Sequence, residues 1–188
     1  MKEVVTDGYH FVFKEEGLEE AFIFDDKSIQ ALHLNTVDII AEYREEDVFI
    51  ELKRFDRQPS FKCPLSKNAN VNNCPVGEDD QATINRIARD LRQKCLDTMV
   101  YRYAEGKELK DVIYVVVVGL DSALATRLND IVGSQMPLGI PKKASLKRPL
   151  KRAIVKNTLV VSVKGWNQSF SERYGRCSRV DGLLERDT

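Results

Sequence analysis

Hydrophobic positions along the chain separate two long, regular segments from shorter runs. Residues 111–120 (DVIYVVVVGL) form one continuous apolar run, which is typical of a strand buried on both faces of a sheet. Residues 81–104 instead carry apolar side chains at the spacing of one helix face, and acidic residues at 78–80 suit a helix N-terminus. The pattern predicts an amphipathic helix followed by a central strand.

Residues 36–54 (TVDIIAEYREEDVFIELKR) predict two antiparallel strands joined by a tight polar turn. If Arg44–Glu45 forms a two-residue turn, Tyr43 pairs with Glu46. The same register sets Asp38 opposite Glu51, with β-carbons about 5 Å apart. A slip of one residue would destroy this pairing.

Side chains alternate between the two faces of a strand, so the hairpin predicts two sets of neighbours. One face of the first strand carries Val37, Ile39 and Ala41, and the other carries Asp38, Ile40 and Glu42. In the second strand, one face carries Val48, Ile50 and Leu52, and the other carries Phe49, Glu51 and Lys53. Ionisable side chains therefore share one face with apolar ones.

Shorter apolar runs predict the remaining elements. These are strands at 9–13, 28–34 and 157–163, a helix after Asp121 to about Val132, and at 19–24 a strand or a buried helical turn. Residues 56–80 and 133–150 are rich in polar residues or proline and predict loops. Together the elements predict an α/β fold with a mixed central sheet flanked by helices. We expect one domain over 1–188, with its core at about 9–164 and a polar C-terminal tail at 165–188.

Composition narrows the class of protein. The chain has 188 residues, of which 43% are hydrophobic and 31% charged, as in globular proteins. No window approaches the roughly 18 to 20 apolar residues of a membrane span, and the N-terminus lacks the apolar run of a signal peptide. Four scattered cysteines do not form a disulfide framework. We therefore expect a cytoplasmic protein that does not engage a membrane.

Charge is distributed unevenly, although the formal net charge is zero. Residues 1–80 carry 18 acidic and nine basic residues, whereas residues 81–188 carry 11 acidic and 20 basic ones. No acidic residue lies between Asp130 and Glu172. The basic residues in that gap are Lys142, Lys143, Lys147, Arg148, Lys151, Arg152, Lys156 and Lys164. The run is interpreted either as a polyanion-binding surface or as a solvated loop that balances the acidic half.

Asp38 and Glu51 carry the candidate chemistry. Two carboxylates side by side at the edge of a core repel each other and are costly without a cation. Mg²⁺ supplies that compensation, commonly through one or two carboxylates with water and substrate phosphate. Lys53 shares the face of Glu51 and can reach the attacking water or the phosphate. This set is suited to phosphodiester hydrolysis, and the alternative is a structural salt-bridge cluster.

The Asp38 strand, followed after a turn by Glu51-Leu52-Lys53, resembles the PD-(D/E)XK, or restriction endonuclease-like, nuclease superfamily. The predicted order of strands, long helix, buried strand, helix and strand agrees with it over roughly residues 9 to 164. Val37 stands where the superfamily's name has proline. The motif is short, and the element order and apolar setting give it weight.

The resemblance implies roles for individual residues. Asp38 and Glu51 would be metal ligands and catalytic residues, Lys53 the catalytic lysine, and Leu52 would offer its backbone carbonyl to Mg²⁺ or Mn²⁺. Many members add an acidic ligand from a preceding helix. The candidates here are Glu16, Glu19 and Glu20, and we keep Glu19 or Glu20 as the possible further metal ligand. A polar residue on the following helix sometimes assists in such proteins, and Gln81 is a weaker candidate for that role.

We therefore expect a Mg²⁺- or Mn²⁺-dependent endo- or exodeoxyribonuclease, with RNA left open as a substrate. The residues expected to hold the phosphate backbone are Lys142, Lys143, Lys147, Arg148, Lys151 and Arg152. A double-strand cut would require a homodimer or a second event. One alternative is a non-catalytic binding or regulatory module on the same fold, as in bacterial defence or toxin–immunity systems, whose acidic half faces a protein partner. Another is a structural charge cluster with no ligand.

Overall fold

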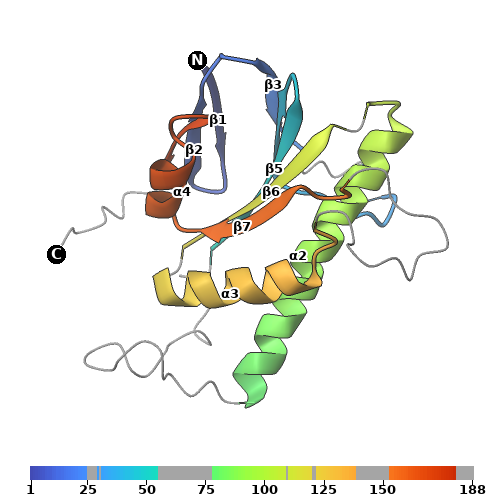
Figure 1. Ribbon diagram of the computed structural model, residues 1–188, viewed down its shortest axis with the longest axis vertical. Coiled ribbons are helices and arrows are strands. Elements are labelled where there is room, and N and C mark those ends of the chain that lie inside the picture. Colours follow the sequence, from blue (N-terminus) through green and yellow to red (C-terminus); the bar gives the residue numbers. More distant parts are fainter. Residues whose placement is uncertain are drawn as a thin grey trace.

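The computed structural model describes residues 1–24, 29, 31–54, 78–108, 110–119, 122–138 and 153–180, without the side chains of 78–81 and 122–124. Within these ranges it forms a five-stranded mixed sheet, a three-stranded sheet and three helices (Figure 1). The predicted α/β fold, with a mixed central sheet flanked by helices, is confirmed. No helix in this part of the chain combines the length and the apolar character needed to cross a membrane.

The central sheet has the strand order β3-β4-β5-β6-β7. Its strands are β3 (Leu18–Ile23), β4 (Ile39–Tyr43), β5 (Glu46–Lys53), β6 (Asp111–Val118) and β7 (Asn157–Val161). The first three pair antiparallel, whereas β6 runs parallel to both β5 and β7. Parallel neighbours need crossover connections. Helix α2 (Glu78–Ala104) lies between β5 and β6 in sequence, and α3 (Ser122–Gln135) lies between β6 and β7.

The two most regular sequence patterns fold as predicted. β6 is buried on both faces from Val112 to Val118, as its unbroken apolar run requires. Helix α2 begins three residues before its first predicted position, with Glu78, Asp79 and Asp80 in its first turn. The predicted strand at 28–34 is wrong, because residues 31–33 form a turn in which His33 has a φ of 56°.

Two hydrophobic layers cover the central sheet. On one face, side chains of α2 and α3 pack against Ile40, Phe49 and Tyr114. On the other face lie β2 (Tyr9–Phe13) and α4 (Val163–Ser169), whose Phe11 and Trp166 pack against side chains such as Ile50. Figure 1 shows α2 and α3 on one side of β6 and β7, with β1, β2 and α4 on the other. Asp38, Glu42, Asp47 and Glu51 therefore face the α2 layer, whereas Glu46 faces the opposite layer, where it contacts Tyr174.

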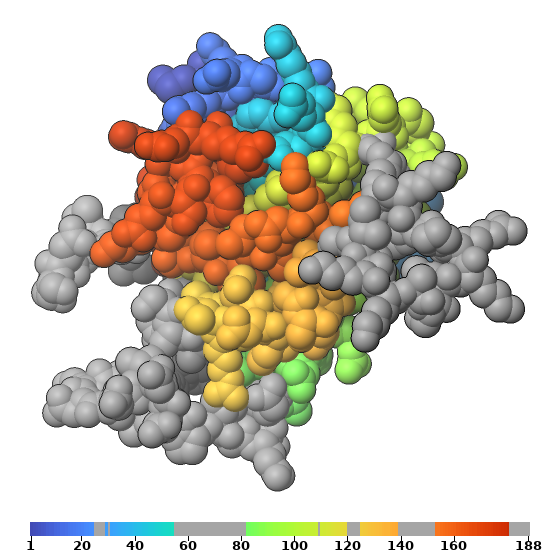
Figure 2. Space-filling view, in the orientation of Figure 1, coloured from blue at the N-terminus to red at the C-terminus, as the bar shows by residue number. Residues whose placement is uncertain are grey.

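The segment that follows residue 164, which the structure describes to residue 180, is not a polar tail, contrary to our prediction. It forms α4 and then β8 (Gly175–Arg179), which pairs with β2 in a sheet ordered β1-β2-β8, where β1 spans Lys2–Thr6. Trp166 is fully buried and donates from its indole nitrogen to the Gly175 carbonyl at 2.9 Å. In Figure 2 this C-terminal segment lies against the N-terminal strands. The polar composition of this segment predicted a tail because β8 buries only alternate residues, such as Cys177, and exposes Arg176 and Ser178.

Candidate functional site

The β4–β5 hairpin has the predicted register. Ile39 lies opposite Ile50 and Glu42 opposite Asp47, with the two intervening pairs in step. One further step along the same register brings Asp38 to the level of Glu51. The turn at residues 44–45 fixes this register because a two-residue loop leaves no slack between the strands. The sequence therefore set two carboxylates beside each other on the face toward α2.

Asp38 and Glu51 are both withdrawn from solvent. Asp38 is 5% exposed and stands one residue before β4, and Glu51 is fully buried in β5. The backbone N–H of Leu52 donates to Oδ2 of Asp38 at 2.6 Å, which ties the carboxylate to the neighbouring strand. Val37 joins the α2-side core instead of sharing the face of Ile39, because the chain bends at Asp38 before the regular strand begins.

Two lysines converge on this carboxylate pair. Lys94, on α2, places Nζ 2.8 Å from Oε1 and 3.0 Å from Oε2 of Glu51. The same Nζ lies 3.6 Å from Oδ1 of Asp38. Lys53, at the end of β5, lies 2.8 Å from Oε1 of Glu51. The side chains of Lys94 and Lys53 are 21% and 32% exposed, so the cluster reaches solvent through its two cations.

The electrostatics of the pair show that this compensation is incomplete. Burial, and after it the negative charge of Glu51, raise the pKa of Asp38 to about 7, although Lys94, the Leu52 N–H and Lys53 each act to lower it. Tyr114 closes the cluster from β6, donating its hydroxyl to the Leu91 carbonyl at 3.0 Å. Burial and then the charge of Glu51 raise the pKa of Tyr114 well above 10, so its hydroxyl stays protonated.

The donor set of this cluster suits a hard divalent cation. Two carboxylates on adjacent strands are the oxygen ligands that Mg²⁺ commonly takes. The raised pKa of Asp38 reflects first its burial and then the neighbouring charge of Glu51, both of which disfavour its ionised form. Within the described ranges, no three His, Cys, Asp or Glu side chains gather as a metal site. A metal here would thus take two protein carboxylates, Asp38 and Glu51, at the position that Lys94 approaches.

The candidate third ligands lie elsewhere. Glu20 pairs with Glu42 on β4, at the opposite end of that strand from Asp38. Glu19 binds Lys110 at 2.5 Å, and Glu16 precedes β3 at the same end. Gln81 lies on α2, but its side chain is not described. All six residues of the predicted phosphate-binding run, from Lys142 to Arg152, lie outside the described residues.

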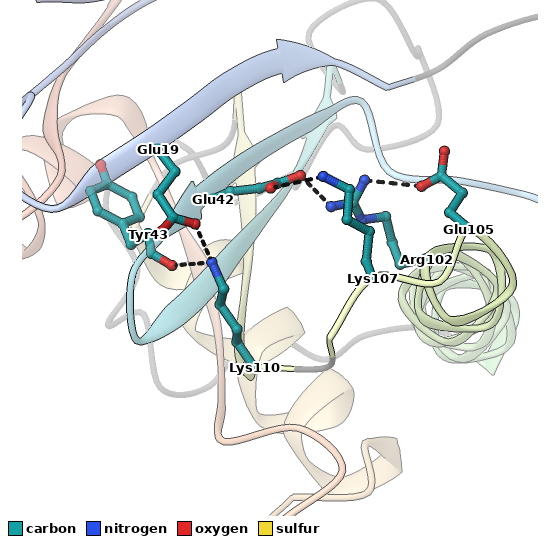
Figure 3. A network of polar contacts seen from close by, with 7 residues as sticks. All are labelled: Glu19, Glu42, Tyr43, Arg102, Glu105, Lys107 and Lys110. Carbon is teal, nitrogen blue, oxygen red and sulfur yellow. Dashed lines mark hydrogen bonds and ion pairs between the residues drawn. The ribbon is translucent and has the colours of Figure 1, made fainter.

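A second acidic pair occupies the same face of the hairpin, at its turn end. Glu42 and Asp47 are directly opposed and buried. Arg102 of α2 binds both Glu42 and Glu105, and Lys107 lies 3.5 Å from Glu42 (Figure 3). Burial raises the pKa of Asp47 to about 6, and its Oδ1 has no hydrogen-bond partner. Helix α2 thus supplies one cation to each acidic pair.

Lys94 was not recognised as a site residue from the sequence. The signal that could have found it lies in the helix periodicity. Leu91, Cys95, Thr98 and Arg102 fall at successive steps of three or four residues and are all buried. Two polar residues on this inward stripe indicate that α2 faces charges on the sheet, and Lys94 borders the stripe.

Searches of protein-family models, of curated proteins and of solved structures found no match to this chain.

Proposed function

We propose that this protein is a divalent-metal-dependent hydrolase of phosphodiester bonds, with DNA as the first substrate to test. The observation that carries the proposal is the pair of buried carboxylates, Asp38 and Glu51, held on adjacent strands with two lysines within 3.6 Å. Burying two neighbouring carboxylates costs stability unless a cation repays it. The resemblance of Asp38 and Glu51-Leu52-Lys53 to the PD-(D/E)XK pattern supports the same chemistry.

Each residue of the cluster has a distinct role in this proposal. Asp38 and Glu51 would hold Mg²⁺ or Mn²⁺, which when bound supplies Lewis-acid polarisation of the phosphate. The Leu52 N–H donates to Oδ2 of Asp38 at 2.6 Å, and this hydrogen bond restricts rotation of the carboxylate. Lys53 can orient the attacking water or stabilise negative charge that develops on phosphate oxygens. Its partly exposed ammonium is the group best placed to meet a substrate.

The location in the sheet supports access by a ligand. Glu51 and Lys53 lie at the carboxyl end of β5, where Lys53 is level with Val118 at the end of the parallel strand β6. Ligands of open α/β sheets bind outside the carboxyl ends of the strands. Asp38 directly precedes the antiparallel neighbour β4 and lies at the same end of the sheet. The cluster therefore lies where the antiparallel part of the sheet joins the parallel part.

The alternative of a structural cluster, or a non-catalytic binding module, has one observation in its favour. Lys94 and Lys53 together match the two carboxylates in charge, so the cluster can be neutral with no metal. Under this alternative, neutralising Asp38 would relieve repulsion and change no binding or activity.

Metal titration and a cleavage assay distinguish these functions. Mg²⁺ and Mn²⁺ binding is measured by calorimetry on the wild type, Asp38→Asn and the matched control Asp47→Asn, beside metal-dependent nicking of supercoiled plasmid. We expect binding and nicking in the wild type and in Asp47→Asn, and loss of both in Asp38→Asn. Metal binding without cleavage of DNA or RNA would keep the metal site and contradict the proposed hydrolase. Equal behaviour of all three proteins contradicts the proposed site.

A further inference from the structure

The ammonium of Lys94 stands where a shared cation would stand. It approaches both oxygens of Glu51, at 2.8 and 3.0 Å, and Oδ1 of Asp38 at 3.6 Å. The other oxygen of Asp38 is occupied by the Leu52 N–H. Lys94 therefore covers the oxygen atoms through which the two carboxylates could bind one metal ion together.

We infer that Lys94 is an internal counterion that competes with the divalent metal for Asp38 and Glu51. The inference rests on the proposed metal site and adds a means of regulating it. Mg²⁺ binds carboxylate oxygens at about 2.0–2.1 Å. An ammonium held at hydrogen-bond distance from the same oxygens would lie against that ion and repel it. The metal therefore enters only as the Lys94 ammonium moves away.

The net charge of the cluster explains why Lys94 would affect metal binding. With both carboxylates ionised, Lys53 and Lys94 leave the cluster neutral, and a divalent ion raises its charge to two positive units unless an ammonium leaves. A positive cluster in a largely buried position is unfavourable. An entering phosphodiester supplies a negative charge, and the displaced Lys94 ammonium can pair with it. Lys94 therefore weakens metal binding in the free protein and makes it depend on the substrate anion.

Lys94 is better suited to this exchange than the other cations near the hairpin. Lys53 contacts Glu51, whereas Lys94 bridges both carboxylates. Lys94 has a flexible four-carbon stem and 21% of its side chain is exposed, so it has a route to solvent. Arg102 at the second acidic pair is nearly buried and is held by both Glu42 and Glu105, which leaves it no comparable freedom.

The test is Mn²⁺ binding by calorimetry without nucleic acid, on the wild type, Lys94→Met and Arg89→Met. Arg89 is exposed on the same helix, so its substitution removes the same charge away from the cluster. We expect Lys94→Met to bind Mn²⁺ at least about tenfold tighter than the wild type, which corresponds to about 1.4 kcal/mol. Arg89→Met should stay within twofold of the wild type. Adding Asp38→Asn to Lys94→Met should abolish the gain.

A second readout uses the wild-type chain and does not depend on how the variant folds. Lysine acetylation followed by mass spectrometry should show Lys94 more reactive when Mg²⁺ is added, while Lys2 on β1 keeps its reactivity. Unchanged or weaker affinity in Lys94→Met, equal gains in both variants, or unchanged Lys94 reactivity at saturating metal would overturn the inference. The proposed hydrolase fails on different evidence, namely absent cleavage by a protein that binds metal.

Discussion

Two acidic pairs on one face of the same hairpin have been compensated in different ways. Asp38 and Glu51 face the lysines Lys94 and Lys53, whereas Glu42 and Asp47 face Arg102, with Lys107 and Lys110 near by. Lysine is a compact charge on a flexible stem, and arginine is a planar fork that can hold two carboxylates at once. Arg102, bound to Glu42 and Glu105, is suited to hold the turn end of the hairpin in one fixed arrangement, and we call this ion-pair group the clamp. At the other end, Lys94 is suited to be replaced by another cation.

The geometry of α2 explains why one helix serves both ends. Lys94 and Arg102 are eight residues apart, which is about 12 Å along a helix. Asp38 and Glu42 are four residues apart, which is about 13 Å along a strand. Eight residues of helix therefore span nearly the same length as four residues of strand, and each cation lies beside its own acidic pair. The difference between the two ends lies in the chemistry of the cations and not in their spacing.

The largest expected effect is at the clamp. Arg102→Ala leaves Glu42 buried opposite Asp47 without its arginine partner, and we expect it to lower the free energy of unfolding by about 3–5 kcal/mol. Urea denaturation followed by circular dichroism measures the loss. A change below about 1 kcal/mol would show that the clamp contributes no more than a surface ion pair and would remove the contrast between the two ends.

Asp38→Asn should have the opposite sign at neutral pH. The pKa of Asp38 rises from 3.8 to about 7 on folding, so between these values the folded chain holds a proton that the unfolded chain has released. The stability linked to this proton is fully present below pH 4 and is lost as pH rises through 7. We expect the variant to be more stable than the wild type by roughly 2 kcal/mol at pH 8 and to lose that advantage near pH 4. Chemical denaturation across this pH range measures it.

Asp47→Asn should show the same sign over a narrower window. The pKa of Asp47 rises from 3.8 to about 6 on folding, so stability falls as pH rises through 6. At pH 8 we expect a gain on the order of 1 kcal/mol, smaller than that of Asp38→Asn. Denaturation curves for both variants at pH 4 and pH 8 compare them directly. A larger gain in stability for Asp47→Asn than for Asp38→Asn would show that the charges of Glu42 and Asp47, and not those of Asp38 and Glu51, are less well compensated by cations.

Lys107→Ala should have the smallest effect. The lysine is half exposed and lies 3.5 Å from Glu42, which Arg102 already binds. Exposed partners of this kind contribute little, and we expect a change within about 0.5 kcal/mol in urea denaturation. A loss comparable to that of Arg102→Ala would mean that the clamp is a network of both cations and not one arginine.

Much of the central sheet and of the acidic pair was predictable because it depends on local patterns. The apolar run of β6 and the helical spacing of α2 indicate their own structures, and the short turn at residues 44–45 sets the register of β4 and β5. The cations were not predictable in the same way. Whether Lys94 reaches Glu51 depends on which side of α2 faces the sheet and on where along the strands it lies.

The sequence by itself determined which residues form β4, β5, β6 and α2, and that Asp38 and Glu51 share a face, since strand alternation and turn length are local properties. Only the tertiary structure decided that Lys94 bridges this pair and that Arg102 binds Glu42. It also decided that residues 175–179 form a strand, because a segment with alternate polar residues becomes β8 only by pairing with β2. These contacts join segments that are far apart in the chain, so they form only when the helix and strands pack together in the folded protein.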